Sequence, residues 1–194
     1  MQATHTNPRR EQRRALRRRE KILHTLLKIG LGLLILGGLI ALAFSNPGPK
    51  VSGPARAGEP IPDFSLTGLA GDTVRLSTFA GRPILINAWA TWCPPCRAEM
   101  PDLHAYYLNH QADGFVILAI NAGETSSPVE SFIAEMGFTF PVLLDPGQAV
   151  LNQLGVHSFP TSILVDRTGA VHEIHVGMLT AAMLEEKITP LLAP

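Results

Sequence analysis

Two patterns of hydrophobic and polar positions alternate along the chain after residue 62. Short, predominantly apolar runs at residues 84–89 and 115–121 predict strands that are buried on both faces of a sheet. Weaker signals predict further strands at 63–68, 73–77, 141–145, 161–166 and 170–176, and helices at 94–110, 128–136, 148–154 and 179–192. Strands that alternate with helices predict an α/β domain with a central mixed sheet and helices on both of its faces.

A longer apolar stretch precedes this domain. Residues 22–44 are predominantly apolar, and the last sixteen of them carry no charged or strongly polar side chain. About 20 helical residues cross the core of a bilayer. We therefore expect a single transmembrane helix at 22–44 that anchors the protein in the lipid bilayer.

The distribution of charge orients this helix. Residues 1–21 carry eight Arg or Lys and two Glu, whereas the chain from residue 46 onward carries seven basic and fourteen acidic residues. Basic residues collect on the cytoplasmic side of membrane spans. We expect segment 1–21 in the cytoplasm and the acidic part outside the cell membrane. A polybasic segment can also bind nucleic acid, but here it runs directly into the apolar stretch, so no nucleic-acid partner is expected.

Segment 45–62 separates the apolar stretch from the domain. Its five prolines and three glycines predict a mobile linker, which leaves 63–194 as the folded domain. A cleaved signal peptide is the alternative to a retained anchor, because Ala55-Arg56-Ala57 matches a small-x-small cleavage pattern. The anchor is favoured, since this pattern lies more than ten residues beyond an apolar run that is long for a signal peptide.

The candidate chemistry lies in Cys93 and Cys96, the two cysteines of the chain. Their C-x-x-C spacing falls between a predicted buried strand and a predicted helix, so Cys93 is expected at a helix amino terminus, where the helix dipole favours a thiolate. Cys93 would attack a substrate disulfide, and Cys96 would resolve the mixed disulfide. A zinc site would need further ligands at suitable spacing. We expect no cofactor and no metal beyond the redox-active Cys93–Cys96 disulfide.

Several stretches carry a family resemblance. Residues 88–96 resemble the W-x-x-W-C-x-x-C signature of thioredoxin-like proteins, and parts of the chain resemble the broader redoxin superfamily. The match is closest to the TlpA/ResA branch, the membrane-tethered thiol-disulfide oxidoreductases of bacteria, many of which serve cytochrome c maturation. Residues 96–101, 121–124, 140–145 and 156–161 extend it. The resemblance implies a thioredoxin-like fold.

The resemblance also implies roles for individual residues. Pro160 is expected to form a cis peptide bond that faces the disulfide and exposes the backbone of Phe159 to substrate. Glu99 lies one helical turn after Cys96 and is expected to carry the proton of that thiol, with an exposed helix glutamate as the alternative. Glu124 is expected only to cap the next helix. The expected substrate-binding residues are Trp92, Pro94, Pro95, Phe159 and Pro160.

The sequence supports a thiol-disulfide reductase for exported proteins, with apocytochrome c as a candidate substrate and a membrane thiol-disulfide carrier as electron donor. A disulfide-forming oxidase is the main alternative, because the direction depends on the reduction potential. A peroxiredoxin-like peroxidase fits less well, because Thr91 stands two residues before Cys93 rather than three. A copper-binding chaperone would space its thiols by three residues.

Overall fold

The computed structural model describes residues 28, 30 and 53–193. The chain divides into two units, Met1–Pro49 and Lys50–Pro194, and the second unit contains the packed domain. Lys28 and Gly30 are helical, and otherwise the predicted transmembrane helix at 22–44 lies outside the described residues. Within the part of the chain that is described, no helix has both the length and the apolar character needed to cross a membrane.

A seven-stranded mixed sheet forms the centre of the domain. Its order is β2-β1-β5-β4-β3-β6-β7. The three central strands β5, β4 and β3 run parallel, and the outer strands pair antiparallel. The strands are β1 Ser65–Gly68, β2 Thr73–Arg75, β3 Ile84–Trp89, β4 Val116–Ala122, β5 Val142–Asp145, β6 Thr161–Val165 and β7 Val171–Val176.

Every residue of β3 and β4 is buried, because the side chains of a strand alternate between two covered faces. In β3, Leu85 and Trp89 belong to one hydrophobic cluster, and Ile84 and Ile86 belong to a second cluster. The two clusters therefore lie on opposite faces of the sheet. Two apolar faces explain why these strands read as continuous hydrophobic runs in the sequence.

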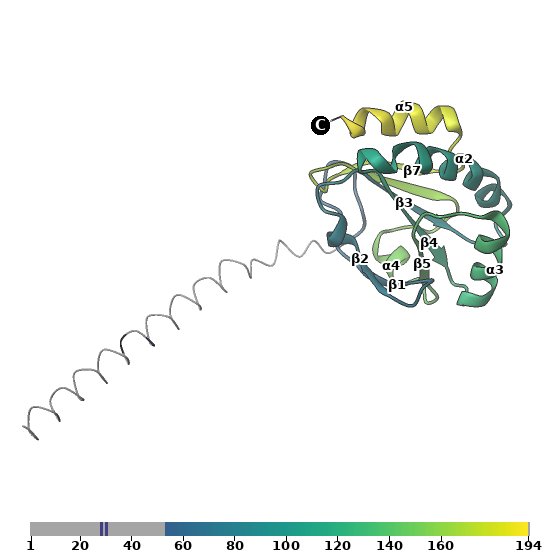
Figure 1. The fold of residues 1–194 in the computed structure, drawn as a ribbon, viewed down its shortest axis with the longest axis horizontal. Coiled ribbons are helices and arrows are strands. Elements are labelled where there is room, and N and C mark those ends of the chain that lie inside the picture. Colours follow the sequence, from purple (N-terminus) through teal and green to yellow (C-terminus); the bar gives the residue numbers. More distant parts are fainter. Residues whose placement is uncertain (1–27, 29, 31–52, 194) are drawn as a thin grey trace, which may run out of the picture. The chain divides into compact units, whose positions relative to one another are not determined.

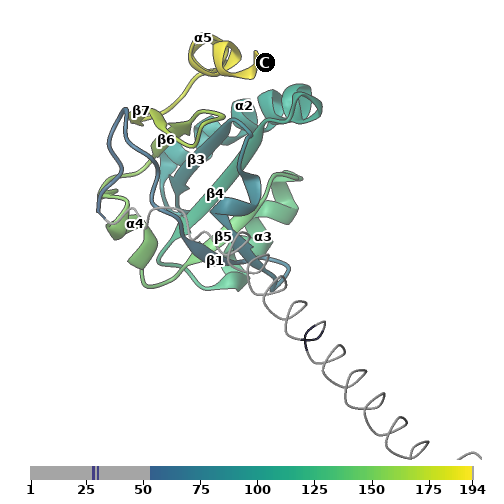
Figure 2. The same cartoon turned by 90° about the vertical axis from the view of Figure 1, so that its left-hand side faces the viewer.

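Helices cover both faces, as predicted (Figures 1 and 2). Leucines and phenylalanines of α2, α3 and α5 pack into the cluster that contains Trp89, and α4 contributes Leu151 to the other. The helix α5 runs alongside α2 (Figure 1). The helices are α2 Pro94–His110, α3 Ser126–Met136, α4 Ala149–Gln153 and α5 Ala181–Leu192, with 3-10 turns η1 Leu76–Phe79 and η2 Gln111–Asp113.

Several element boundaries differ from the sequence prediction by one or two residues, and at two of them the structure shows a local reason. The strand expected at 73–77 ends at Arg75, because the Asp63 carboxylate accepts hydrogen bonds from the Ser77 N–H (3.0 Å) and hydroxyl (3.2 Å) and the chain enters η1. The helix expected at 179–192 begins at Ala181, because Thr180 is its N-cap and accepts from the Met183 N–H. The predicted bounds of β3 and α2 agree with the structure.

The packed domain begins earlier than the boundary at residue 63 that the sequence predicted. Ala55 is buried, and its N–H donates to the Leu154 carbonyl (3.1 Å). Further along, the Gly58 N–H donates to the Val171 carbonyl (2.8 Å), and the Val171 N–H donates to the Glu59 carbonyl (2.9 Å). A Pro- and Gly-rich composition thus predicted a linker, but backbone pairing with the start of the edge strand β7 fixes this segment.

We predict that Leu85→Ala lowers the free energy of unfolding by about 2–5 kcal/mol, because Leu85 is fully buried between β3 and the covering helices and its removal leaves a cavity. Leu108→Ala is the matched control, since Leu108 lies on the surface of α2, and it should change stability by less than about 0.5 kcal/mol. Urea denaturation measures both. Equal losses for the two variants would contradict this assignment of the core.

Candidate active site

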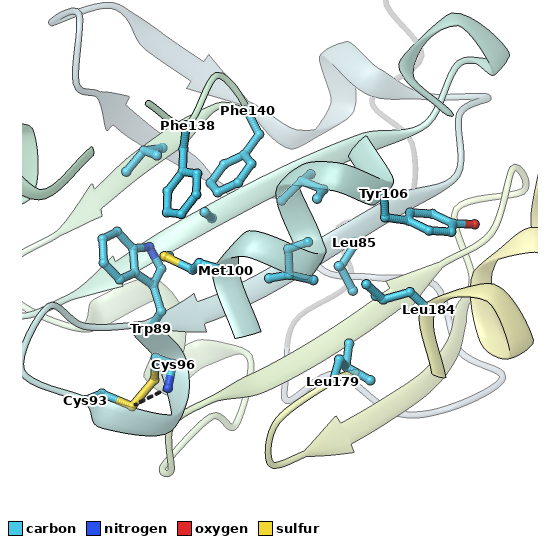
Figure 3. Packing of buried hydrophobic residues seen from close by; sticks show 14 of the residues in the cluster. Leu85, Trp89, Cys93, Cys96, Met100, Tyr106, Phe138, Phe140, Leu179 and Leu184 are labelled. Atoms are coloured by element: carbon cyan, nitrogen blue, oxygen red, sulfur yellow. Dashed lines mark hydrogen bonds between the residues drawn. A yellow bond between two sulfur atoms is a disulfide. The ribbon is translucent and has the colours of Figure 1, made fainter. Parts of the chain in front are cut away.

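The two cysteines form a disulfide at the junction of β3 and α2, with their Cα atoms 5.3 Å apart. Cys93 is the N-cap of α2, and its Sγ accepts a hydrogen bond from the Cys96 N–H at 3.3 Å (Figure 3). Pro94 begins the helix, where a missing N–H removes no helical hydrogen bond. Cys96 is fully buried, as expected for the inner thiol. After reduction, the Cys93 sulfur would keep this helix-terminal position, which favours a thiolate.

An apolar surface borders the disulfide. Trp92 is 63% exposed, and its ring lies edge-on to Phe159 with 6.1 Å between the centroids. Pro94 and Pro95 are also exposed. The peptide bond between Phe159 and Pro160 is cis, in agreement with the expectation from the family resemblance. The structure thus brings Trp92 against Phe159, although 66 positions of sequence separate them.

Glu99 is buried beneath the site, with 1% of its surface exposed. One carboxylate oxygen accepts from the Asn87 side-chain amide (2.8 Å), and the other accepts from the Leu179 N–H (2.7 Å). Burial raises the pKa of Glu99 to about 7, although the hydrogen bonds from Leu179 and Asn87 lower it. The alternative of an exposed helix glutamate is therefore wrong, and Glu99 can exchange a proton near neutral pH.

The sequence analysis missed Asn87, which binds Glu99, and Ser162, which binds Asn87. Asn87 lies at the centre of β3, faces α2, and donates both to Glu99 and to the Ser162 hydroxyl of β6 (3.0 Å). The Asn87 Oδ1 atom is buried and has no hydrogen-bond partner among the described residues. A single polar side chain within an otherwise apolar strand was the signal in the sequence that pointed to this site.

Glu124 does not cap α3, which corrects the expectation from the sequence. The N-cap of α3 is Thr125, whose side chain accepts no capping hydrogen bond. The Glu124 carboxylate instead accepts from the Thr91 N–H (2.8 Å), from the Thr91 hydroxyl and from the Asn121 side-chain amide (2.7 Å). Burial raises the pKa of Glu124, but these hydrogen bonds outweigh it, so the pKa lies below its usual value.

The family follows from a comparison with known sequences. The family model described as Redoxin matches residues 56–188, which include the disulfide, Glu99, Glu124 and the cis proline. The chain belongs to the redoxin family. Its C-x-x-C pair, its fold and its relatives agree that this redoxin is of the ResA/TlpA type.

Two curated relatives carry the same name. A "Thiol-disulfide oxidoreductase ResA" of Geobacillus kaustophilus is 40% identical over 131 residues, which are 68% of this chain and 75% of that protein. The protein of the same name from Bacillus anthracis is 35% identical over 161 residues, which are 81% of this chain and 93% of that protein. With the disulfide at the helix terminus, these relatives show that this redoxin is a thiol-disulfide oxidoreductase.

Solved structures show the same fold. A Chlorobium tepidum protein assigned as the thiol:disulfide interchange protein DsbE superposes with a TM-score of 0.67 at 34% identity, over 72% of this chain and 99% of that one. StoA of Bacillus subtilis superposes with a TM-score of 0.57 at 27% identity, over 66% of this chain and 96% of that one. The predicted thioredoxin-like fold is therefore confirmed for the domain.

We predict that Glu99→Gln removes a pH dependence of stability. Between pH 4.5 and about 7 the folded protein holds a proton on Glu99 that the unfolded chain has released, so the free energy of unfolding falls as pH rises through this window. A pKa shift of this size corresponds to about 3 kcal/mol. Between pH 4.5 and about 7, the wild-type redoxin should therefore lose about 3 kcal/mol more stability than Glu99→Gln.

Urea unfolding at pH 4.5 and pH 8 measures this difference. Glu135→Gln removes an exposed glutamate of α3 and should leave the pH dependence as in the wild type. If Glu99→Gln lost as much stability as the wild type over the same interval, Glu99 would not be protonated in the folded redoxin near neutral pH.

Proposed function

We propose that this redoxin is a membrane-tethered reductase of protein disulfides that works outside the cytoplasm through Cys93 and Cys96. The observation that carries the proposal is the position of Cys93: it caps the amino terminus of α2 beside the exposed Trp92. A sulfur at a helix amino terminus is a stabilised thiolate when reduced. An exposed tryptophan next to it provides an apolar contact for a protein substrate.

The reaction proceeds in two exchange steps. The Cys93 thiolate attacks one sulfur of the substrate disulfide, the substrate S–S bond breaks, and the other substrate sulfur leaves as a thiolate that takes up a proton. The Cys96 thiolate then attacks the Cys93 sulfur and releases the second substrate sulfur. Two electrons pass from the dithiol to the substrate, and the redoxin ends as the disulfide that the structure contains. The residues around the site, Trp92, Pro94, Pro95, Phe159 and Pro160, bind the substrate segment.

Glu99 takes the proton from Cys96 in the second step. It lies one turn after Cys96 on α2, which places both side chains on the same face of the helix. Its pKa of about 7 suits a group that accepts and returns a proton near neutral pH. Among the described residues, the buried Asn87 Oδ1 has no partner, and it can accept a hydrogen bond from a protonated Glu99 once the amide group turns over.

The membrane anchor at 22–44 and the position outside the cytoplasm rest on hydropathy and charge. The alignment with the Bacillus anthracis relative covers 81% of the chain and therefore includes part of the segment before residue 53. In this setting the substrates are exported proteins with disulfides, apocytochrome c among them. A thiol-disulfide carrier in the membrane supplies the electrons, since the redoxin ends each cycle as a disulfide that has to be reduced again.

We predict that Cys96→Ser accumulates mixed disulfides through Cys93, because the resolving thiol is absent. Cys93→Ser should abolish disulfide reduction and accumulate none. Non-reducing electrophoresis of the full-length variants, expressed in a bacterium and quenched with acid, detects the adducts, and mass spectrometry identifies their partners. A c-type apocytochrome among them would support the maturation role. If Cys96→Ser trapped no exported protein, the proposed roles of the two thiols would be wrong.

The reduction potential decides the direction. We predict that full-length redoxin in detergent, equilibrated with dithiothreitol buffers, has a potential near or below about −230 mV, in the range of thioredoxin and the more reducing glutaredoxins. Such a value supports a reductase. A value near about −120 mV, as in a strong oxidant, would show a disulfide-forming oxidase instead.

A further inference from the structure

Glu124 closes a contact between two loops at the active site. The Cys93 N–H donates to the Ala90 carbonyl (3.2 Å), so residues 90–93 form a tight turn between β3 and α2, with Thr91 and Trp92 at its centre. Glu124 lies in the loop after β4 and binds both the N–H and the hydroxyl of Thr91. The Glu124 carboxylate therefore binds the turn that places Cys93 at the amino terminus of α2.

The other contacts of Glu124 keep this carboxylate in place. The Asn121 side-chain amide donates to the same oxygen that accepts from the Thr91 N–H. In the sheet, Asn121 pairs with Trp89, the last residue of β3. Gly123 has a positive φ of 77°, which lets the chain reverse between Asn121 and Glu124. Asn121 and Gly123 therefore orient the Glu124 carboxylate towards the turn.

No partner among the described residues neutralises the charge of Glu124. Within residues 53–193, the Glu124 carboxylate takes part in no ion pair. Its hydrogen bonds keep it ionised, and its binding partner Thr91 stands two residues before Cys93. A fixed negative charge close to a thiol disfavours the thiolate. A thiolate that is stabilised stabilises the reduced form of the pair, so a charge that disfavours the thiolate destabilises the reduced form. The charge of Glu124 therefore makes the dithiol a stronger reductant.

We propose that Glu124 is a positioning residue of the dithiol site, which holds the Thr91–Trp92 turn so that Cys93 is aligned for attack and which biases the redox equilibrium towards the disulfide through its charge. Glu124 acts through Thr91 and does not touch the reacting sulfurs. The inference rests on the dithiol reaction described above.

Three variants separate the two effects. Glu124→Ala removes the hold and the charge. Glu124→Gln removes the charge but keeps an oxygen for the Thr91 N–H and the Asn121 amide, and the Thr91 hydroxyl can rotate to accept from the new amide. Thr91→Val deletes one hydrogen bond and leaves the charge. The matched control is Glu135→Gln, an exposed glutamate of α3.

We predict that Glu124→Ala lowers kcat/KM for reduction of a synthetic disulfide-bonded peptide at least tenfold, and that Thr91→Val lowers it at least threefold. Glu124→Gln should keep kcat/KM within about threefold of the wild type. It should shift the equilibrium with a glutathione buffer at least threefold towards the dithiol, which is about 14 mV at ~30 mV per tenfold change. Glu135→Gln should change neither quantity. The full-length protein in detergent serves for all measurements.

Thermal unfolding of each variant accompanies these assays. A merely structural Glu124 would lower the melting temperature of Glu124→Ala and leave kcat/KM and the redox equilibrium within twofold of the wild type, and this result would overturn the proposal. If Glu124→Ala fails to fold, the other two variants test the proposal. It is overturned if kcat/KM of Thr91→Val and the redox equilibrium of Glu124→Gln both stay within twofold of the wild type. Cys93→Ser distinguishes a failure of the proposed dithiol reaction from a failure of the role of Glu124. If Cys93→Ser loses activity while the Glu124 and Thr91 variants behave like the wild type, only the role of Glu124 is refuted.

Discussion

The parallel pairing of β3 with β4 is the constraint on which the rest of the structure depends. Parallel strands bring their carboxyl ends to the same edge of a sheet, and the register sets Trp89 beside Asn121 at that edge. The turn that carries Cys93 and the loop that carries Glu124 therefore leave the sheet next to each other. Both strands are buried on both faces, so the hydrophobic effect fixes the pairing that places the chemistry.

The same burial sets the environment of Glu99. Asn87 and Ser162 are polar side chains on the face of the sheet that α2 covers, and Glu99 comes down from α2 to meet Asn87. Leu179, 80 residues further along the chain, closes the cluster with its backbone N–H. A carboxyl group that is removed from water in this way favours its neutral form. The environment, and not the residue type, gives Glu99 a pKa close to neutrality.

The two glutamates at the site show how burial and hydrogen bonding compete. Glu99 is almost fully enclosed and accepts two hydrogen bonds, and desolvation dominates, so its pKa rises. Glu124 is partly exposed and accepts three hydrogen bonds from Thr91 and Asn121, and these dominate, so its pKa falls. One glutamate with a pKa near neutrality and one that is kept ionised thus belong to the same site. Environments that push the pKa values of two like groups apart are typical of active sites.

The sequence by itself determined the elements and the reacting pair. The apolar run at 84–89 predicted β3 to the residue, and Pro94, which suits the first position of a helix, marked the start of α2. The C-x-x-C spacing located the disulfide, because this chemistry is local in the chain. Only the tertiary structure decided what Asn87, Glu124 and the segment before residue 63 do. Apart from Asn121 beside Glu124, their partners lie in other elements, 12 to more than 100 residues away, and pairing over such distances depends on the register of a folded sheet, which no local pattern encodes.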